Sequence, residues 1–185
     1  ATTTSKLRRQ SVKTDGAPDF VKKVTAVIYA GKGDLLPVSA MPIDGSFPTD
    51  TAKYEKRSIA LDIPIWDPSI CIDCAMCAFV CPHAAIRPKF YEASALANAP
   101  ATFKSIDAMT GQLKGLKYTL QVAPEDCTGC EVCVQACPVV AKDEQGNKTD
   151  KRAINMASQI PLRQPERENF EFFLNIPEPD SAKFN

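Results

Sequence analysis

Two stretches of the chain alternate hydrophobic and polar residues with a period of two. The hydrophobic positions are Ile59, Leu61, Ile63 and Ile65 in the first stretch, and Leu116, Tyr118, Leu120 and Val122 in the second. Successive side chains of a β-strand point to opposite faces, so this spacing predicts one strand in each stretch. Short apolar segments at residues 84–87 and, past a turn at 145–147, at 153–156 predict a second strand for each.

Three other segments carry weaker patterns. Residues 21–30 are rich in valine and isoleucine and are expected to form a strand. Four prolines between residues 36 and 64 predict an extended arm. In the tail, Phe170, Phe173 and Leu174 have helical spacing, so we expect a short packing helix that starts near Pro165; a partner-binding face is the alternative.

The two predicted halves are separated by an insertion at residues 92–115. It is rich in alanine, and residues 94–96 could start a short helix. Glycines at positions 111 and 115 predict turns before the next strand. We expect this insertion to shield a site in one of the halves or to contact a neighbouring domain.

The charge balance and the hydropathy exclude two classes of partner. The chain has 22 Lys and Arg and 22 Asp and Glu residues, so it signals no basic face for nucleic acid. No stretch approaches the roughly 18 apolar residues that a membrane helix needs, so we expect no membrane association. Residues 1–14 lack acids and are rich in Thr, Ser, Lys and Arg; a polar linker is favoured over a mitochondrial transit peptide.

All eight cysteines fall in two runs of the same spacing. The first run is Cys71, Cys74, Cys77 and Cys81, followed by Pro82; the second is Cys127, Cys130, Cys133 and Cys137, followed by Pro138. Both read C-x2-C-x2-C-x3-C-P, the pattern that holds a [4Fe–4S] cluster. Three cysteines two residues apart can wrap three corners of the cube, with loop N–H groups directed at the sulfurs. The sequence therefore predicts two [4Fe–4S] clusters and no catalytic residue.

The fourth cysteine of each run is expected to reach the cluster of the other run, as in two-cluster proteins with this motif. Cys71, Cys74, Cys77 and Cys137 are therefore predicted to hold one cluster, at what we call site 1. Cys127, Cys130, Cys133 and Cys81 are predicted to hold the other, at site 2. Two halves of strand, cluster loop, helix and strand would then form one structural unit.

Three alternatives explain the cysteines less well. Disulfides would need an oxidising compartment, and the chain shows no secretory hydrophobic region. Structural zinc uses pairs of C-x2-C units and explains neither the third cysteine nor the C-P ending. Inert buried cysteines would not repeat one spacing twice. Iron–sulfur ligation is strongly favoured over all three.

Three further residues near the motifs could influence the clusters. His83 could donate an N–H to a sulfur, although a hydrogen bond with nearby backbone is favoured. Asp73 stands where the second run has Gly129, so its carboxylate should slightly lower the potential of the cluster at site 1. Trp66 is expected to be a core aromatic rather than an electron relay. No phosphate-binding glycine motif occurs.

Sequences outside the cysteine runs resemble one family. They are residues 36–40 (LPVSA), 44–49 (DGSFPT), 54–57 (YEKR), 66–68 (WDP), 81–87 (CPHAAIR), 123–130 (APEDCTGC), 153–156 (AINM), 161–163 (PLR) and 166–170 (ERENF). Together they resemble the dicluster segment of the pyruvate:ferredoxin (flavodoxin) oxidoreductases, over about residues 20–177. The resemblance implies an α+β fold with a bacterial-type dicluster ferredoxin-like core of two pseudo-symmetric halves. Its expected parts are an arm and linker at 1–58, the cluster domain at 59–156 and a tail with a short helix at 157–185.

The resemblance also implies a parent enzyme with its own substrate chemistry. That enzyme would bind thiamine diphosphate, Mg²⁺ and a third [4Fe–4S] cluster elsewhere, and would oxidise pyruvate with coenzyme A to acetyl-CoA and CO2. Electrons would pass singly through the two clusters of this chain to ferredoxin or flavodoxin. A homodimer in the cytoplasm is expected, or in a mitochondrion or hydrogenosome. The alternatives are a free-standing dicluster ferredoxin and the same segment of a pyruvate:NADP⁺ oxidoreductase.

Overall fold

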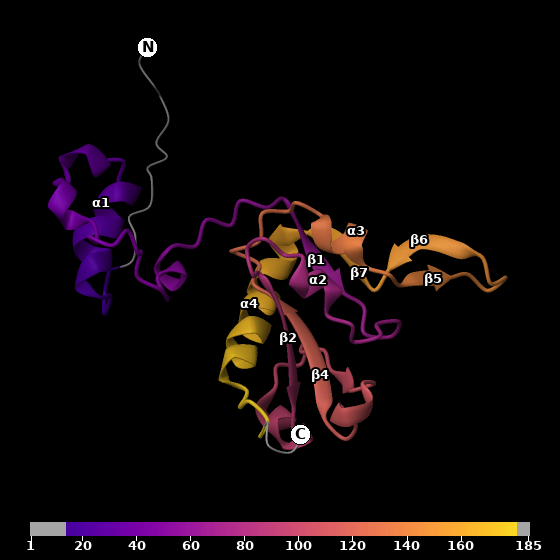
Figure 1. Cartoon of the computed structure of the whole chain (residues 1–185). Coiled ribbons are helices and arrows are strands. Elements are labelled where there is room, and N and C mark those ends of the chain that lie inside the picture. Colours follow the sequence, from indigo (N-terminus) through magenta and orange to yellow (C-terminus); the bar gives the residue numbers. More distant parts are fainter. Residues whose placement is uncertain (1–13, 181–185) are drawn as a thin grey trace, which may run out of the picture. The chain divides into compact units, whose positions relative to one another are not determined.

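The computed structural model describes residues 14–180 (Figure 1). Contacts divide the chain between Lys56 and Arg57 into two units, and each is described by itself. The polar linker predicted at the N-terminus lies almost wholly outside the described residues, as do residues 181–185 of the tail. No helix within residues 14–180 has the length and apolar character needed to cross a membrane. The predicted domain limits stay a prediction.

The first unit begins with a helix where the sequence predicted a strand. A wide helical turn at Val21–Thr25 continues into α1 (Ala26–Tyr29). Val21 and Val24 are buried, whereas Lys22 and Lys23 are exposed. The strand prediction over residues 21–30 was wrong, because the spacing of the buried side chains follows the helical period and not the period of two. The arm that follows contains single turns at Gly33–Leu35, Val38–Ala40 and Ala52–Tyr54.

The second unit contains three small antiparallel sheets, which confirms a mixed helix and strand fold. Strand β1 (Asp62–Trp66) pairs with β7 (Ile154–Ser158). Strand β4 (Lys117–Val122) pairs with β2 (Ile86–Tyr91) on one side and β3 (Ile106–Asp107) on the other. The hairpin of β5 (Val140–Lys142) and β6 (Lys148–Arg152) extends away from the other two sheets (Figure 1).

Each cysteine run contains a short helix that ends before its fourth cysteine. Helix α2 (Met76–Phe79) follows the first loop, and α3 (Val132–Ala136) follows the second. The two helices pack against each other. The elements therefore succeed one another as β1, loop, α2, β2 in the first half and β4, loop, α3 in the second, where the β5–β6 hairpin delays the return strand β7.

Strand β4 is buried on both of its faces. Leu120 and Val122 face the hydrophobic core, but Thr119 and Gln121 are buried as well. These two polar side chains are paired: the Gln121 amide donates to Thr119 Oγ1 at 2.8 Å, and the Thr119 hydroxyl donates to the Lys104 carbonyl at 2.7 Å. The alternating pattern predicted the strand correctly, but the polar face is covered because the C-terminal helix packs on it.

That helix, α4 (Gln159–Asn175), is longer than the sequence predicted. It starts six residues before Pro165, which lies inside it. A proline in a helix interior removes one backbone hydrogen bond, so its position suggested a start and not an interior. Burial of Phe173, Asn169 and Gln159 on one side of α4 holds the helix against the sheet in spite of that loss. Packing, and not partner binding, thus accounts for Phe173.

Lys89 of β2 ties down the end of this helix. Its buried ammonium donates to the carbonyls of Phe173 at 3.2 Å and Ile176 at 2.8 Å, and it pairs with Glu178 at 3.2 Å. The last carbonyls of a helix lack partners within the helix, and a cation there is favourable.

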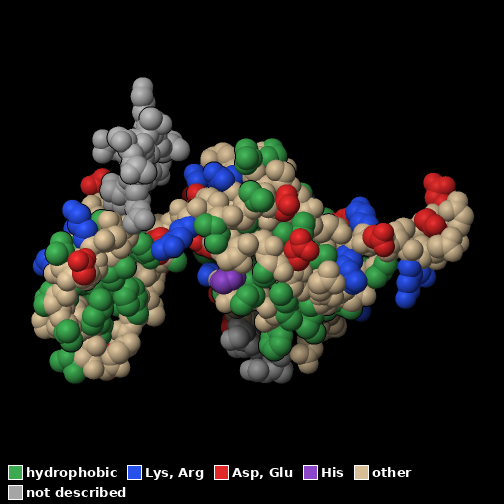
Figure 2. Space-filling model, turned by 90° about the horizontal axis from the view of Figure 1, so that it is seen from above, with side chains coloured by type: hydrophobic (Ala, Val, Ile, Leu, Met, Phe, Trp, Pro, Cys, Tyr) green, Lys and Arg blue, Asp and Glu red, His purple; other side chains and the backbone are tan. Residues whose placement is uncertain are grey.

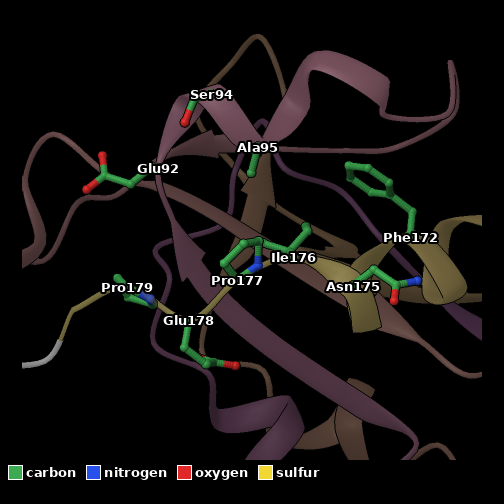
Figure 3. Close-up of a pocket in the computed structure, with 9 residues that line it drawn as sticks. All are labelled: Glu92, Ser94, Ala95, Phe172, Asn175, Ile176, Pro177, Glu178 and Pro179. Atoms are coloured by element: carbon green, nitrogen blue, oxygen red, sulfur yellow. The ribbon is translucent and has the colours of Figure 1, made fainter.

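Next to this contact, residues 92–95 and the segment after α4 line a pocket of about 280 Å³ (Figure 3).

Replacing Lys89 by methionine is expected to release the end of α4. The change keeps the apolar stem and removes two charge-assisted hydrogen bonds, each of which contributes about 1.5–3 kcal/mol. Hydrogen exchange at the Ile176 amide, which donates to the Phe173 carbonyl, should accelerate by about tenfold or more. Lys117→Met is the control, because Lys117 pairs with the exposed Asp107 and should contribute little. Unchanged exchange at Ile176 would refute this anchoring role.

Candidate metal centre

The two cysteine loops share the same unusual backbone conformation. Asp73 and Gly129 both have positive φ, at +48° and +72°, and so do Ala75 and Glu131, at +53° and +63°. Each pair occupies the same place in the two C-x2-C-x2-C runs. Only the second loop needs a glycine for space, since a Cβ on Gly129 would lie 3.1 Å from the Asp62 carbonyl oxygen. The internal repeat of the sequence is therefore also a repeat of the backbone.

The structure brings together the four cysteines predicted for site 2. Cys81, Cys127, Cys130 and Cys133 line one pocket, to which the first run contributes only its fourth cysteine. Cys127 and Cys133 are buried, Cys81 is partly buried and Cys130 is exposed. Apolar side chains, including those of Ile86 and Met156, complete the lining of this pocket.

The cysteines predicted for site 1 gather at the main hydrophobic core. Cys137, from the second run, is buried in that core, and Cys71 and Cys77 pack against it, while Cys133 and Cys81 of site 2 border the same core. Cys74 is exposed, as its counterpart Cys130 is at site 2. Each site thus has one cysteine at the surface and the others wholly or partly covered. The assignment of individual thiolates to individual irons stays a prediction.

The electrostatics of the thiols follow this grouping except that Cys133 of site 2 also acts on Cys77 of site 1. Burial raises the pKa of Cys77 to about 12, with smaller contributions from Cys71, Cys133 and Cys137. Burial likewise raises the pKa of Cys133 to about 11, with contributions from Cys127, Cys130 and Cys81. Thiols with raised pKa values stay protonated near neutral pH, whereas ligation needs thiolates. A cationic iron core would reverse this preference and displace the protons.

Backbone N–H groups point at the cysteine sulfurs, as the loop motif predicted. The Gly129 N–H donates to Cys127 Sγ at 3.4 Å. The N–H groups of Asp73, Ala78 and Val134 act in the same way on Cys71, Cys77 and Cys133, and each opposes the rise in the pKa of that thiol. Such bonds stabilise negative charge on sulfur in a bound cluster.

The residues present fit iron–sulfur clusters. Within residues 14–180, no three His, Cys, Asp or Glu side chains converge as ligands of a single ion do. The four irons of a cube occupy separate corners, so its ligands need not converge on one point. Beside site 1, the Trp66 indole nitrogen and the Tyr118 hydroxyl are buried, and among the described residues they find no acceptor other than the Cys71 sulfur, toward which the indole N–H is directed. Unpaired buried donors of this kind suit a group that presents sulfur acceptors.

Asp73 links the first cysteine loop to the insertion. Its side chain is buried, and its Oδ2 accepts from the Met109 N–H at 2.6 Å and the Thr110 N–H at 3.2 Å. The Thr110 hydroxyl donates to Oδ1 at 3.1 Å. The insertion therefore lies over the loop of site 1, consistent with a shielding role. The sequence singled out Asp73, but no signal marked Met109 and Thr110 as its partners.

Replacing Asp73 by asparagine is expected to raise the reduction potential of the cluster predicted at site 1. The amide keeps the shape of the side chain and removes a negative charge next to Cys74, and negative charge opposes electron uptake. Potentiometric titration followed by electron paramagnetic resonance measures the shift. Asp150→Asn is the control, since Asp150 is exposed on β6. Identical potentials in the Asp73 variant and the parent would contradict the assignment of Asp73 to site 1.

Two other predicted residues have clear positions. Trp66 is buried in the main core, which confirms the core role expected for it. Its indole also faces Cys71, where it opposes the rise in the pKa of the thiol that burial causes. His83 is exposed and contributes to the lining of the pocket at site 2. Its expected hydrogen bond stays a prediction.

The surface shows mixed charge. On the face drawn in Figure 2, lysine and arginine side chains are interspersed with aspartate and glutamate, and hydrophobic side chains lie between them. Exposed apolar residues occur near both cysteine loops, among them Ile72 and Phe79 beside site 1 and Val132 beside site 2.

Comparisons with known proteins cover almost the whole chain. A model of a 4Fe-4S dicluster domain matches residues 70–141, and a domain of unknown function matches residues 6–60. A pyruvate-flavodoxin oxidoreductase of Nostoc sp. is 55% identical over 94% of this chain and 14% of its own length. A probable pyruvate-flavodoxin oxidoreductase of Escherichia coli is 51% identical over 95% of this chain and 15% of its own length. A mitochondrial pyruvate dehydrogenase [NADP(+)] of Euglena gracilis is 40% identical over 90% of this chain and 8% of its own length.

The chain thus spans about one-seventh of the length of these pyruvate-flavodoxin oxidoreductases. The similarity covers the cysteine runs, the arm before them and the tail after them. The family resemblance seen in the sequence is confirmed.

Proposed function

This chain belongs to the pyruvate-flavodoxin oxidoreductases as one segment of a longer enzyme, and on that premise we propose that it relays single electrons through two [4Fe–4S] clusters. The observation that carries the proposal is the pocket lined by Cys81, Cys127, Cys130 and Cys133, in which one cysteine run completes the site of the other. When bound, the clusters would supply reversible one-electron transfer.

The arrangement of the cysteines suits a relay with two ends. Cys74 and Cys130 are the exposed ligands of sites 1 and 2, while Cys77, Cys133 and Cys137 lie toward the shared core. Each site would therefore present one side to a partner and one side to the other site. Helices α2 and α3, which carry Cys77 and Cys133, pack together between them. We infer that electrons enter at one exposed ligand and leave at the other.

The protein side chains would hold and insulate the clusters. Ile63, Ile86, Ile154 and Val122 exclude water from the region around the thiolates, and exclusion of water strengthens each N–H···S interaction. Exchange of the fourth cysteine would fix the spacing of the two sites through the same residues that fix the fold. We propose that the two halves are related by a pseudo-twofold axis, since Trp66 pairs with Ile154 in the first sheet and Val122 pairs with Ile86 in the second.

The rest of the enzyme would supply the carbon chemistry. We propose thiamine diphosphate, Mg²⁺ and a third [4Fe–4S] cluster on other domains, with pyruvate and coenzyme A as substrates. The assembly is proposed to be a cytoplasmic homodimer that delivers electrons to flavodoxin or ferredoxin. These features of the proposal rest on the family to which the chain is similar.

The alternatives differ in what supports them. A free-standing dicluster ferredoxin is disfavoured, since the similarity to the oxidoreductases extends through the arm before the cysteine runs and the tail after them. An NADP⁺-linked enzyme is supported by the relatives with that name, although their identity to this chain is lower. The reading frame after residue 185 distinguishes the two enzymes, because the NADP⁺-linked enzyme needs a flavin domain.

Serine replacement of Cys74 or Cys130 in the intact enzyme tests the relay. We expect pyruvate-dependent exchange of labelled CO2 to persist, because decarboxylation needs no residue of this segment. Reduction of flavodoxin by pyruvate should fall to background, because each variant removes one exposed ligand from the relay. Flavodoxin reduction at the parent rate in both variants would contradict the proposed function.

A further inference from the structure

Two buried hydrogen-bond donors lie beside site 1, and the protein offers them no acceptor other than the sulfur of Cys71. Tyr118 is completely buried and Trp66 is 4% exposed. Among residues 14–180, the Tyr118 hydroxyl finds no hydrogen-bond partner, and the Trp66 indole N–H reaches only the sulfur of Cys71, a cysteine of site 1. An unsatisfied buried donor costs about 1–3 kcal/mol, and native proteins rarely keep two of them side by side. The ring centroids of Trp66 and Tyr118 are 5.9 Å apart in an edge-to-face arrangement, so the two donors belong to one packed aromatic pair.

Both donors lie against the cysteines of site 1. Trp66 and Tyr118 belong to the buried core against which Cys71 and Cys77 pack. Burial raises the pKa of Tyr118, and negative charge on Cys71, Cys77 and Asp73 raises it further. The hydroxyl is therefore held as a neutral donor next to the thiolates. The Trp66 indole acts on Cys71 itself, whose thiolate it favours.

Site 2 has no such pair at the corresponding places. Trp66 precedes its cysteine run by five residues, where the second run has Val122. Tyr118 precedes the second run by nine residues, and the residue at the same distance before the first run is Asp62. Asp62 lies at site 2, because its carbonyl is close to Gly129 of the site 2 loop. Val122 has no side-chain donor, and Asp62 is exposed and offers only acceptors. The repeat thus departs from symmetry at the two positions that carry the unpaired donors.

We propose that the Tyr118 hydroxyl and the Trp66 indole N–H donate hydrogen bonds to sulfur atoms of the cluster at site 1, and that they raise the reduction potential of that cluster alone. A donor to sulfur stabilises the more negative, reduced cluster. Its effect opposes that of the Asp73 carboxylate on the same site. Tyr118 and Trp66 are thus tuning residues of one step in the relay. The inference rests on the proposed function, because it requires clusters in this chain.

Potentiometric titration of the intact enzyme, followed by electron paramagnetic resonance, tests the proposal. In Tyr118→Phe we expect the midpoint potential of one cluster to become more negative and that of the other clusters to stay. Trp66→Phe should move the same signal in the same direction, and Asp73→Asn should move it in the opposite direction. Tyr91→Phe is the matched control, because Tyr91 is equally buried but donates to Ser105 Oγ at 2.7 Å.

A second measurement detects hydrogen bonds to the cluster sulfurs directly, first in the parent enzyme and then in Tyr118→Phe. Resonance Raman spectra of parent enzyme whose clusters were assembled in H2O or D2O should differ in the Fe–S stretching region, and Tyr118→Phe should reduce the difference. Potentials and spectra in Tyr118→Phe that match the parent and the Tyr91 control would overturn the inference. Iron analysis distinguishes failure of the proposed function from failure of this inference. A chain without iron would contradict the proposed function. An iron-loaded chain with unchanged potentials would contradict only the role of the Tyr118 and Trp66 donors.

Discussion

Serine replacement of Cys71 together with Cys137 is expected to remove one cluster, about four iron atoms, from the intact enzyme. Replacement of Cys71 together with Cys81 is expected to remove both clusters of this chain, about eight iron atoms. The two double variants each change one ligand in the first run and one fourth cysteine. They differ only in whether the two cysteines serve the same site.

The structure supplies the reason for this difference. Cys81 lines the pocket of Cys127, Cys130 and Cys133, although it lies in the first run. Cys137 lies in the core against which Cys71 and Cys77 pack. Loss of two ligands from one cube should therefore cost no more iron than loss of one, whereas loss of one ligand from each cube should cost twice as much.

Elemental analysis of iron, with electron paramagnetic resonance of the reduced protein, measures the result. The single variants Cys71→Ser, Cys81→Ser and Cys137→Ser provide the reference values. If Cys71→Ser/Cys81→Ser kept one intact cluster and Cys71→Ser/Cys137→Ser kept none, each run would hold its own cluster. The exchanged ligation would then be wrong.

Removal of iron is expected to unfold residues 57–180. The second unit has three small sheets and two helices of four and five residues beside the cysteine loops. Its two hydrophobic cores include the side chains of Cys127, Cys133 and Cys137. Metal binding of this kind is also folding free energy, and a small core without it rarely suffices.

Far-ultraviolet circular dichroism during iron chelation under reducing conditions measures this loss. Hydrogen exchange should lose protection in β2, β4 and α4 together, because Lys89 and the core join them. Addition of the chelator already saturated with iron is the control. Native dichroism and native protection after complete iron removal would show that the fold does not depend on the clusters.

The strands next to the cysteine loops were predictable because hydrophobic and polar residues alternate along them, although both faces of β4 are buried. The prediction for the first strand began at Ile59, but β1 begins at Asp62, and Ile59 and Leu61 are exposed. Its partner β7 ends at Ser158, which pairs with Asp62, and α4 starts at the next residue. The pairing therefore ends where the partner turns into a helix, which no local pattern in residues 59–61 can reveal.

Helix α4 could not be predicted in full, because long-range contacts decide where it begins. Pro165 disfavours a helix interior locally, yet contacts of Gln159 and Asn169 hold the helix through it. The Asn169 side chain accepts from the Thr102 hydroxyl at 2.9 Å, across 67 positions of sequence. Such long-range hydrogen bonds outweigh local propensity, and they are invisible in the pattern of residues 157–175.

The ligands of the candidate site could be predicted, but their surroundings could not. Repeated spacing marked all eight cysteines, because the geometry of a cube fixes the loop around it. Tyr118 appeared only as a strand position, and Thr110 only as a turn residue. Their roles depend on the antiparallel pairing of β4 and on the docking of the insertion on Asp73, which are tertiary contacts.

One measurement tests the relay most directly: electron paramagnetic resonance of the full-length enzyme, frozen after addition of pyruvate and coenzyme A, with iron and zinc determined on the same sample. Our account predicts about eight iron atoms attributable to this segment and reduced [4Fe–4S] signals that develop with pyruvate and disappear on addition of oxidised flavodoxin. The Cys71→Ser/Cys81→Ser variant should lack the signals of the two clusters in this segment and keep only that of the third cluster proposed elsewhere in the enzyme. Zinc in place of iron, or cluster signals that do not respond to pyruvate, would contradict the account.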